Sequence, residues 1–147
     1  YHYTEQVRTL VDSILENPEF IGGTASFDTK VIKASKGKIF CKSGAEGVFL
    51  FIDIQKEISG VVKITDGNER AIPISILNLF KKLKIMSRVE LKILEEIETF
   101  DLQNHAGKKI GHISLTMKWE TKILLLKPSK AVLDSKMPFY LSRLQIK

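Results

Sequence analysis

Residues 39–65, IFCKSGAEGVFLFIDIQKEISGVVKIT, decide the fold of this chain. Three apolar runs lie within them, at Ile39–Cys41, Val48–Ile54 and Gly60–Thr65. Each run has the length and the aromatic or β-branched composition of a strand. The links, Lys42–Gly47 and Gln55–Ser59, are short, and links this short join neighbouring antiparallel strands. The segment therefore predicts a three-stranded antiparallel meander.

Helical periodicity flanks this predicted meander on both sides. Apolar residues recur at helical spacing in residues 4–17, and Pro18 ends the pattern. After the meander, residues 73–84 begin with a proline and carry a wide apolar face. Residues 89–97 also have helical spacing. The expected fold class is α+β, an antiparallel sheet meander flanked by helices.

The C-terminal third of the chain is less ordered in its pattern. Asn104–Gly107 indicates a turn, and Ile110–Thr116 indicates a short strand. Beyond Met117 no period organises the apolar residues. We therefore expect one domain over residues 1–115 and a divergent tail of uncertain structure over residues 116–147.

The composition limits the classes of partner. Hydrophobic residues make up 44% and charged residues 27% of the 147 residues, which indicates a globular domain rather than a disordered chain. The net charge of +6 could favour nucleic acid, but the lysines are spread through the sequence without alternating aromatic residues. The apolar runs are too short to cross a membrane. We expect neither a nucleic-acid partner nor a membrane partner.

The metal-ligating residue types are few and scattered. Cys41 is the only cysteine, which excludes an internal disulfide and indicates a reducing compartment, so the expected localisation is cytoplasmic. Residues 1–6 lack the pattern of an export signal. The three histidines, His2, His105 and His112, are too far apart in sequence to predict a metal site. We expect no metal, no cofactor, and a Cys41 that points into the core.

The chemistry of the predicted meander is concentrated in Lys42-Ser43-Gly44, which ends the first strand. A lysine ammonium lowers the cost of deprotonating a nearby nucleophile and holds an anionic substrate group. A small hydroxyl can donate to a substrate, and a glycine lets its backbone approach closely. The tripeptide alone is more typical of a solvated turn, so only its setting can favour the functional interpretation.

Four segments in order resemble the C-terminal half of the bacterial type II L-asparaginase family. They are Gly23–Thr29 (GTASFDT), Phe40–Val48 (FCKSGAEGV), Lys63–Ala71 (KITDGNERA) and Asn104–Gly111 (NHAGKKIG). The resemblance implies hydrolysis of L-asparagine to aspartate and ammonia. It also implies a partial serine-β-lactamase-like fold, in which a Lys-Ser/Thr-Gly strand edge faces a nucleophilic serine.

The resemblance assigns roles to the loop at the end of the first strand. Lys42 is the expected catalytic lysine, and Ser43, Gly44, Ala45 and Glu46 are expected to line the substrate pocket. The family has an arginine where this chain has Ser26, which removes any ion pair of that arginine. We interpret Asp28 and Asp66 as cap or turn acceptors rather than catalytic acids.

This sequence departs from the family pattern because two of the family's catalytic residues are not among these 147 residues. The family's nucleophilic serine and its lysine, separated by two residues, belong to an N-terminal half that these residues do not contain. Ser35 and Lys38 have that spacing by accident, in a predicted turn. We expect a fragment that is inactive alone and that binds L-asparagine only with the missing half, with possible self-association through an exposed sheet face. The alternative is a non-catalytic α+β binding or structural module.

Overall fold

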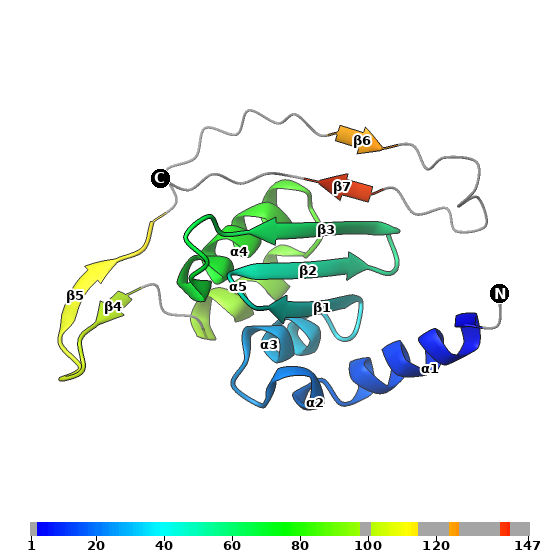
Figure 1. Ribbon diagram of the computed structural model, residues 1–147, viewed down its shortest axis with the longest axis horizontal. Coiled ribbons are helices and arrows are strands. Elements are labelled where there is room, and N and C mark those ends of the chain that lie inside the picture. The colour runs from blue at the N-terminus through cyan, green and yellow to red at the C-terminus, as the bar shows by residue number, and fades with distance from the viewer. Residues whose placement is uncertain (1–2, 98–100, 115–123, 127–138, 142–147) are drawn as a thin grey trace.

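The computed structural model describes residues 3–97, 101–114, 124–126 and 139–141 (Figure 1). Its helices are α1 (Tyr3–Glu16), α2 (Glu19–Gly22), α3 (Phe27–Ala34), the 3-10 helix η1 (Glu69–Ala71), α4 (Ile72–Lys82) and α5 (Arg88–Ile97). Its strands are β1 (Ile39–Gly44), β2 (Val48–Asp53), β3 (Ile58–Lys63), β4 (Asp101–Gln103), β5 (Lys109–His112), β6 (Leu124–Leu126) and β7 (Phe139–Leu141). The α+β class is confirmed.

The predicted antiparallel meander forms the main part of the larger sheet, whose order is β1-β2-β3-β7-β6. β1 pairs with β2 and β2 with β3, so Lys42 lies opposite Leu50 and Leu50 opposite Val61. The strand boundaries differ from the prediction: β3 begins and ends two residues earlier than predicted, and β2 ends one residue earlier. The largest difference is in β1, which continues through Gly44, so Lys42 and Ser43 are strand residues and only Ala45–Gly47 form the turn. The strand continues because its ladder with β2 extends to the Gly44–Val48 pair.

One face of the meander is the core face, covered by α3, α4 and α5 (Figure 1). Cys41, Phe49, Phe51 and Val62 point to it and are at most 1% exposed. The Phe51 ring meets Phe80 of α4 edge to face, with ring centroids 5.0 Å apart. Aromatic pairs in this geometry add to the free energy that burial alone supplies.

The opposite face of the meander is apolar but less well covered. Four of its residues, Phe40, Leu50, Ile52 and Val61, are only partly buried, although their neighbours along each strand are fully buried. Lys42 shares this face because side chains alternate along a strand. We call these four apolar residues the open face.

The N-terminal helix α1 has an apolar stripe that the rest of the described structure covers at one end only. Ile14 and Leu15 pack against the core, while Val7 is 56% and Leu10 is 61% exposed. Figure 1 accordingly shows α1 extending away from the sheet beyond α2. The predicted helix over residues 4–17 is confirmed.

The helices after the meander begin and end where local sequence signals place them. Pro73 lies in the first turn of α4, as predicted, and Asn68 caps η1 by accepting from the Arg70 amide at 2.9 Å. α5 confirms the helix predicted over residues 89–97. These helices carry Ile76, Phe80 and Leu94 into the core.

The C-terminal third contributes a small hairpin and two short strands. β4 and β5 form a separate two-stranded sheet. The strand predicted over residues 110–116 is β5, which begins one residue earlier and ends at His112, and residues 115–116 lie outside the described residues. β7 pairs in parallel with β3, and β6 pairs with β7. Most of the predicted tail lies outside the described residues. Within the described part, no helix is long and apolar enough to cross a membrane.

Candidate functional site

The Lys-Ser-Gly triad lies at the end of β1, the first strand in the sheet order. Cys41 points into the core, Lys42 lies on the open face, and Ser43 lies on the core face near α3. An outer strand leaves alternate backbone amides without a ladder partner. The Ser43 amide is therefore free to bond to a group outside the sheet.

That group is the carboxylate of Asp28, in the first turn of α3. Its Oδ2 accepts from the Ser43 amide at 2.9 Å, and its Oδ1 accepts from the Ser43 hydroxyl at 2.5 Å. The Lys42 ammonium lies 3.6 Å from Oδ2. Asp28 is 2% exposed. A buried carboxylate thus binds the backbone and side chain of Ser43 and the charge of Lys42 at once.

The interpretation of Asp28 as a cap or turn acceptor is wrong. The cap of α3 is Ser26, whose side chain accepts from the Thr29 amide at 3.2 Å, so the Asp28 carboxylate is free to reach β1. Ser26 occupies the position where the family pattern has arginine. Asp28 and Ser43 lie fifteen positions apart in the sequence, so a local pattern could not predict this contact. Only the packing of α3 on β1 brings the carboxylate to the triad.

The Asp28 position is held by the loop before α3. The Thr29 hydroxyl is shared between two carbonyl oxygens, those of Gly23 at 2.7 Å and Pro18 at 3.0 Å. Thr29 is 1% exposed. These buried contacts attach the start of α3 to α2, and so fix the position of Asp28 beside β1.

The Lys42 ammonium is half-exposed and stays beside the strand end. It donates to the Ser43 carbonyl oxygen at 2.6 Å, and 48% of the side chain is exposed. The neighbouring Cys41 is fully buried, which confirms that it points away from Lys42. Burial, and secondly the charge of Asp28, raises the pKa of the Cys41 thiol far above its usual value. Cys41 is therefore a core residue rather than a nucleophile.

The turn after β1 packs against the turn after β3, which contains another segment of the family resemblance. Ala45 and Glu46 are exposed. Gly47 has φ +68°, and a Cβ there would lie 2.9 Å from the Ile64 Cβ and 3.1 Å from the Gly67 backbone. Only glycine fits this left-handed, closely packed position. The structure thus places the Lys-Ser-Gly-Ala-Glu-Gly turn directly against the Asp-Gly-Asn turn.

Asp66 behaves as predicted, as a turn acceptor. Its carboxylate accepts from the Asn68 amide at 3.0 Å and pairs with Arg70. The amide hydrogen bond, followed by the Arg70 contacts, holds the pKa of Asp66 below its usual value. The fourth segment forms the β4–β5 hairpin, which projects beyond the helices and the sheet (Figure 1). In this hairpin His112 Nδ1 lies 2.9 Å from the Asp101 carboxylate.

The two members of the Ser35–Lys38 pair have other partners in the structure. Ser35 follows α3 and is fully buried, where its hydroxyl donates to the Ile32 carbonyl at 3.0 Å. Lys38 pairs with Glu90 of α5. The spacing is accidental, as predicted. Among the described residues, no group of three or more histidine, cysteine, aspartate or glutamate side chains could hold a metal ion.

The fold and the residues at the end of β1 define the structural class of this protein. The class is an α+β protein with a Lys-Ser-Gly triad at the end of an outer antiparallel strand. The model of the L-asparaginase II family matches residues 1–115, which is most of the chain. The chain belongs to the L-asparaginase II family. No curated protein matches it.

Proposed function

We propose that this chain forms the Lys42-Ser43-Gly44 wall of an amidohydrolase site for L-asparagine, and that the nucleophilic serine comes from a segment outside these 147 residues. The observation that carries the proposal is the double hydrogen bond of the Asp28 carboxylate to Ser43, with Lys42 beside it. An amidohydrolase needs its cation and its hydroxyl in fixed positions, because catalysis depends on preorganised charge.

Lys42 supplies the charge in this proposal. Its ammonium lies at the strand end and is half-exposed, so it remains accessible from the open face. There it stabilises the alkoxide of an incoming serine and binds the α-carboxylate of the amino-acid substrate. Asp28 offsets part of that charge and keeps the ammonium at the strand end rather than in water.

Ser43 has a different role from the hydrogen-bond donor that its triad position predicts. Its hydroxyl proton is directed at a carboxylate, which only accepts, so the Ser43 oxygen offers its lone pairs to a ligand. A group that donates, such as the α-ammonium of L-asparagine, fits that oxygen. The negative charge of Asp28 behind it favours the same ammonium.

The uncovered apolar surface supports a site completed by another segment. The open face of the sheet is only partly buried, and Val7 and Leu10 of α1 are largely exposed. Apolar surface of this kind marks a contact with further protein. A second lobe packed there would lie on the side of the sheet that carries Lys42.

The test is an asparaginase assay of this chain alone and mixed with the polypeptide encoded directly upstream. We expect release of ammonia only from the mixture, and loss of that activity in Lys42→Ala. Lys33→Ala is the matched control, because it removes a lysine of similar exposure on α3 and should leave activity unchanged. Activity of this chain alone would contradict the proposed external nucleophile, and an active Lys42→Ala mixture would contradict the role of Lys42.

The alternative is a non-catalytic α+β module that recruits a partner through the same open face. It predicts a complex with the upstream polypeptide that has no hydrolase activity and that forms equally well with Lys42→Ala. Size-exclusion chromatography detects the complex, and together with the asparaginase assay it distinguishes the two functions.

A further inference from the structure

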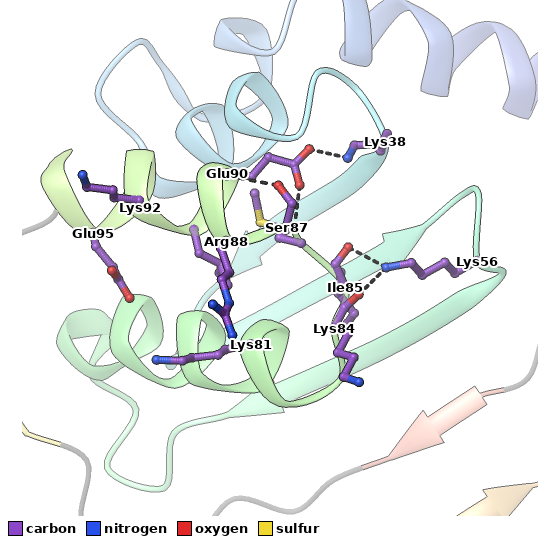
Figure 2. A pocket seen from close by; sticks show the side chains of 12 residues that line it. Lys38, Lys56, Lys81, Lys84, Ile85, Ser87, Arg88, Glu90, Lys92 and Glu95 are labelled. Atoms are coloured by element: carbon purple, nitrogen blue, oxygen red, sulfur yellow. Dashed lines mark hydrogen bonds and ion pairs between the residues drawn. The ribbon is translucent and has the colours of Figure 1, made fainter.

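A concave site lies between α4, α5 and the residue before the start of β1, away from the Asp28 carboxylate. Its volume is about 990 Å³, within the range of small-molecule sites. Six cations line it, from Lys38, Lys56, Lys81, Lys84, Arg88 and Lys92. Two carboxylates, Glu90 and Glu95, also line it. Residues that are spread over more than fifty positions of the sequence thus gather around one hollow, which we call the basic pocket (Figure 2).

Two of these cations have structural partners. Lys38 pairs with Glu90, whose other oxygen accepts from the Ser87 amide at 2.7 Å. Lys56 donates to the carbonyl oxygens of Lys84 and Ile85, and lies 3.7 Å from the buried Asp53 carboxylate. Figure 2 shows both sets of contacts. They hold the turn between α4 and α5, and so hold the wall of the basic pocket.

Three other cations lack such partners. Within the described part of the chain, no ion pair joins Lys81, Lys84 or Arg88 to a carboxylate. They come from the last turn of α4, from the connecting turn, and from the first residue of α5. In Figure 2 the Arg88 side chain extends toward α4, the helix that carries Lys81. All three residues are exposed, and like charges that line one hollow favour the binding of an anion among them.

The backbone around Lys84 is rigidly defined. The Ile85 amide donates to the Phe80 carbonyl at 2.9 Å and the Lys84 amide to the Lys81 carbonyl at 3.3 Å, which is the Schellman pattern that ends a helix. Lys84 has φ +53°, in the left-handed region where glycine is usual. Lys84 thus carries a charged side chain at a backbone position that favours glycine, and it lines a pocket with five other cations.

We propose that the basic pocket binds a small polyanion that carries a chain of phosphate groups. Six cations against two carboxylates leave the walls of the basic pocket predominantly positive, and concave walls with such an excess focus the potential. No aromatic residue lines the described pocket, and Ile85, Met86 and Leu91 are at most 6% exposed, so a base would find no stacking surface. Recognition therefore rests on the phosphates, and does not depend on the proposed hydrolase function.

The test is isothermal titration calorimetry of the full chain with inorganic tripolyphosphate, ATP, adenosine and a single-stranded oligonucleotide. We expect saturable 1:1 binding of tripolyphosphate and ATP with affinities within about threefold of each other, because only the phosphates are recognised. Affinity should fall steeply as salt rises. Adenosine should not bind. Tighter binding of ATP than of tripolyphosphate by tenfold or more would overturn recognition by phosphate alone.

The chain contains an unusually close control. Lys36 follows α3 with φ +53°, and it has the same pair of hydrogen bonds, Gly37 amide to Ile32 carbonyl and Lys36 amide to Lys33 carbonyl, both at 3.0 Å. Lys36→Gln and Lys84→Gln therefore impose the same backbone cost at the same helix-end position. Only Lys84 lines the basic pocket.

We expect the double variant Lys84→Gln/Arg88→Gln to weaken tripolyphosphate binding at least tenfold. The control double variant Lys36→Gln/Arg8→Gln, which removes the same charge elsewhere, should weaken it less than twofold. Circular dichroism and thermal midpoints confirm that both variants are folded. Equal losses in both variants, tighter binding of the oligonucleotide than of tripolyphosphate, or no saturable binding by the wild-type chain would each overturn the proposal.

Discussion

Two carboxylates at opposite ends of β1 perform similar tasks by different routes. Near the end of the strand, Asp28 accepts from the amide of Ser43 and pairs with Lys42. Before its start, Glu90 accepts from the amide of Ser87 and pairs with Lys38. Each arrangement joins one carboxylate, one serine amide and one lysine of the β1 region. They differ in how far apart in sequence the carboxylate and the serine lie.

The Glu90 arrangement is mostly local. Ser87 and Glu90 form a capping box, in which the Ser87 hydroxyl also accepts from the Glu90 amide at 3.3 Å. They lie three positions apart, so the start of α5 is fixed as soon as that helix forms. The Asp28 arrangement exists only when α3 has docked beside β1. We therefore expect Glu90 to stabilise a helix end, and Asp28 to stabilise the docking of a helix on the sheet.

The largest effect is expected from Asp28→Ala. It leaves the amide and hydroxyl of Ser43 without their buried acceptor, and the free energy of unfolding should fall by about 3 kcal/mol. Urea unfolding measures the loss. Asp12→Ala, which removes an exposed aspartate of α1, should change stability by less than about 0.5 kcal/mol. Equal small effects of the two substitutions would show that Asp28 does not dock α3.

An intermediate effect is expected from Glu90→Gln, about 1–2 kcal/mol, because glutamine keeps an acceptor for Ser87 but loses the charge. Burial raises the pKa of Glu90, but the hydrogen bonds from Lys38 and Ser87 outweigh it and hold that pKa below its usual value. The carboxylate therefore stabilises the fold above its unfolded pKa, and this contribution is lost as the pH falls through the folded pKa.

Unfolding curves at several pH values test the predicted direction of this pH dependence. The stability difference between the wild-type chain and Glu90→Gln should be full at pH 7 and should shrink as the pH falls below about 4. Glu95→Gln, on the exposed side of α5, is the matched control and should show little difference at any pH. A difference that stays constant from pH 7 to pH 3 would contradict the ion pair.

The smallest effects are expected from the lysines. Lys38→Gln and Lys42→Gln should each cost less than about 1 kcal/mol, because the side chains are 34% and 48% exposed and solvent screens their charge. Lys42→Gln should nevertheless abolish activity in the mixture with the upstream polypeptide. Thermal unfolding and the ammonia assay together make this comparison. Strong destabilisation by Lys42→Gln would mean that the buried Asp28 charge depends on its cation for folding rather than for chemistry.

Much of the fold could be predicted because its signals are local. The three strands, the proline that opens α4 and the spacing of α5 each lie within a dozen residues, and all are confirmed. The errors fall where hydrogen-bond partners decide. β1 extends to Gly44 because its backbone pairs with β2 as far as Val48. Asp28 is not the cap of α3 because the Ser26 side chain is, and the Asp28 carboxylate instead binds Ser43. β6 and β7 follow no period in the sequence, so their place in the sheet could not be predicted.

The candidate site also has one part that the sequence could predict and one part that it could not. The Lys-Ser-Gly triad is contiguous, so the sequence could name Lys42, Ser43 and Gly44 and relate them to a family. The roles of Ala45 and Glu46 in substrate binding stay predictions. The direction of the Ser43 hydroxyl could not be predicted, because its acceptor belongs to another element.

By itself, the sequence determined the order of the three-stranded meander and of the helices α1, α4 and α5, the family, and the position of the triad near a strand end. Only the tertiary structure decided which carboxylate binds that triad and that dispersed lysines gather around one hollow. The physical reason is the distance in sequence over which each kind of interaction acts. Helix and strand periodicity act between residues a few positions apart, whereas charge and burial act through space and depend on how α3, α4 and α5 pack on the sheet.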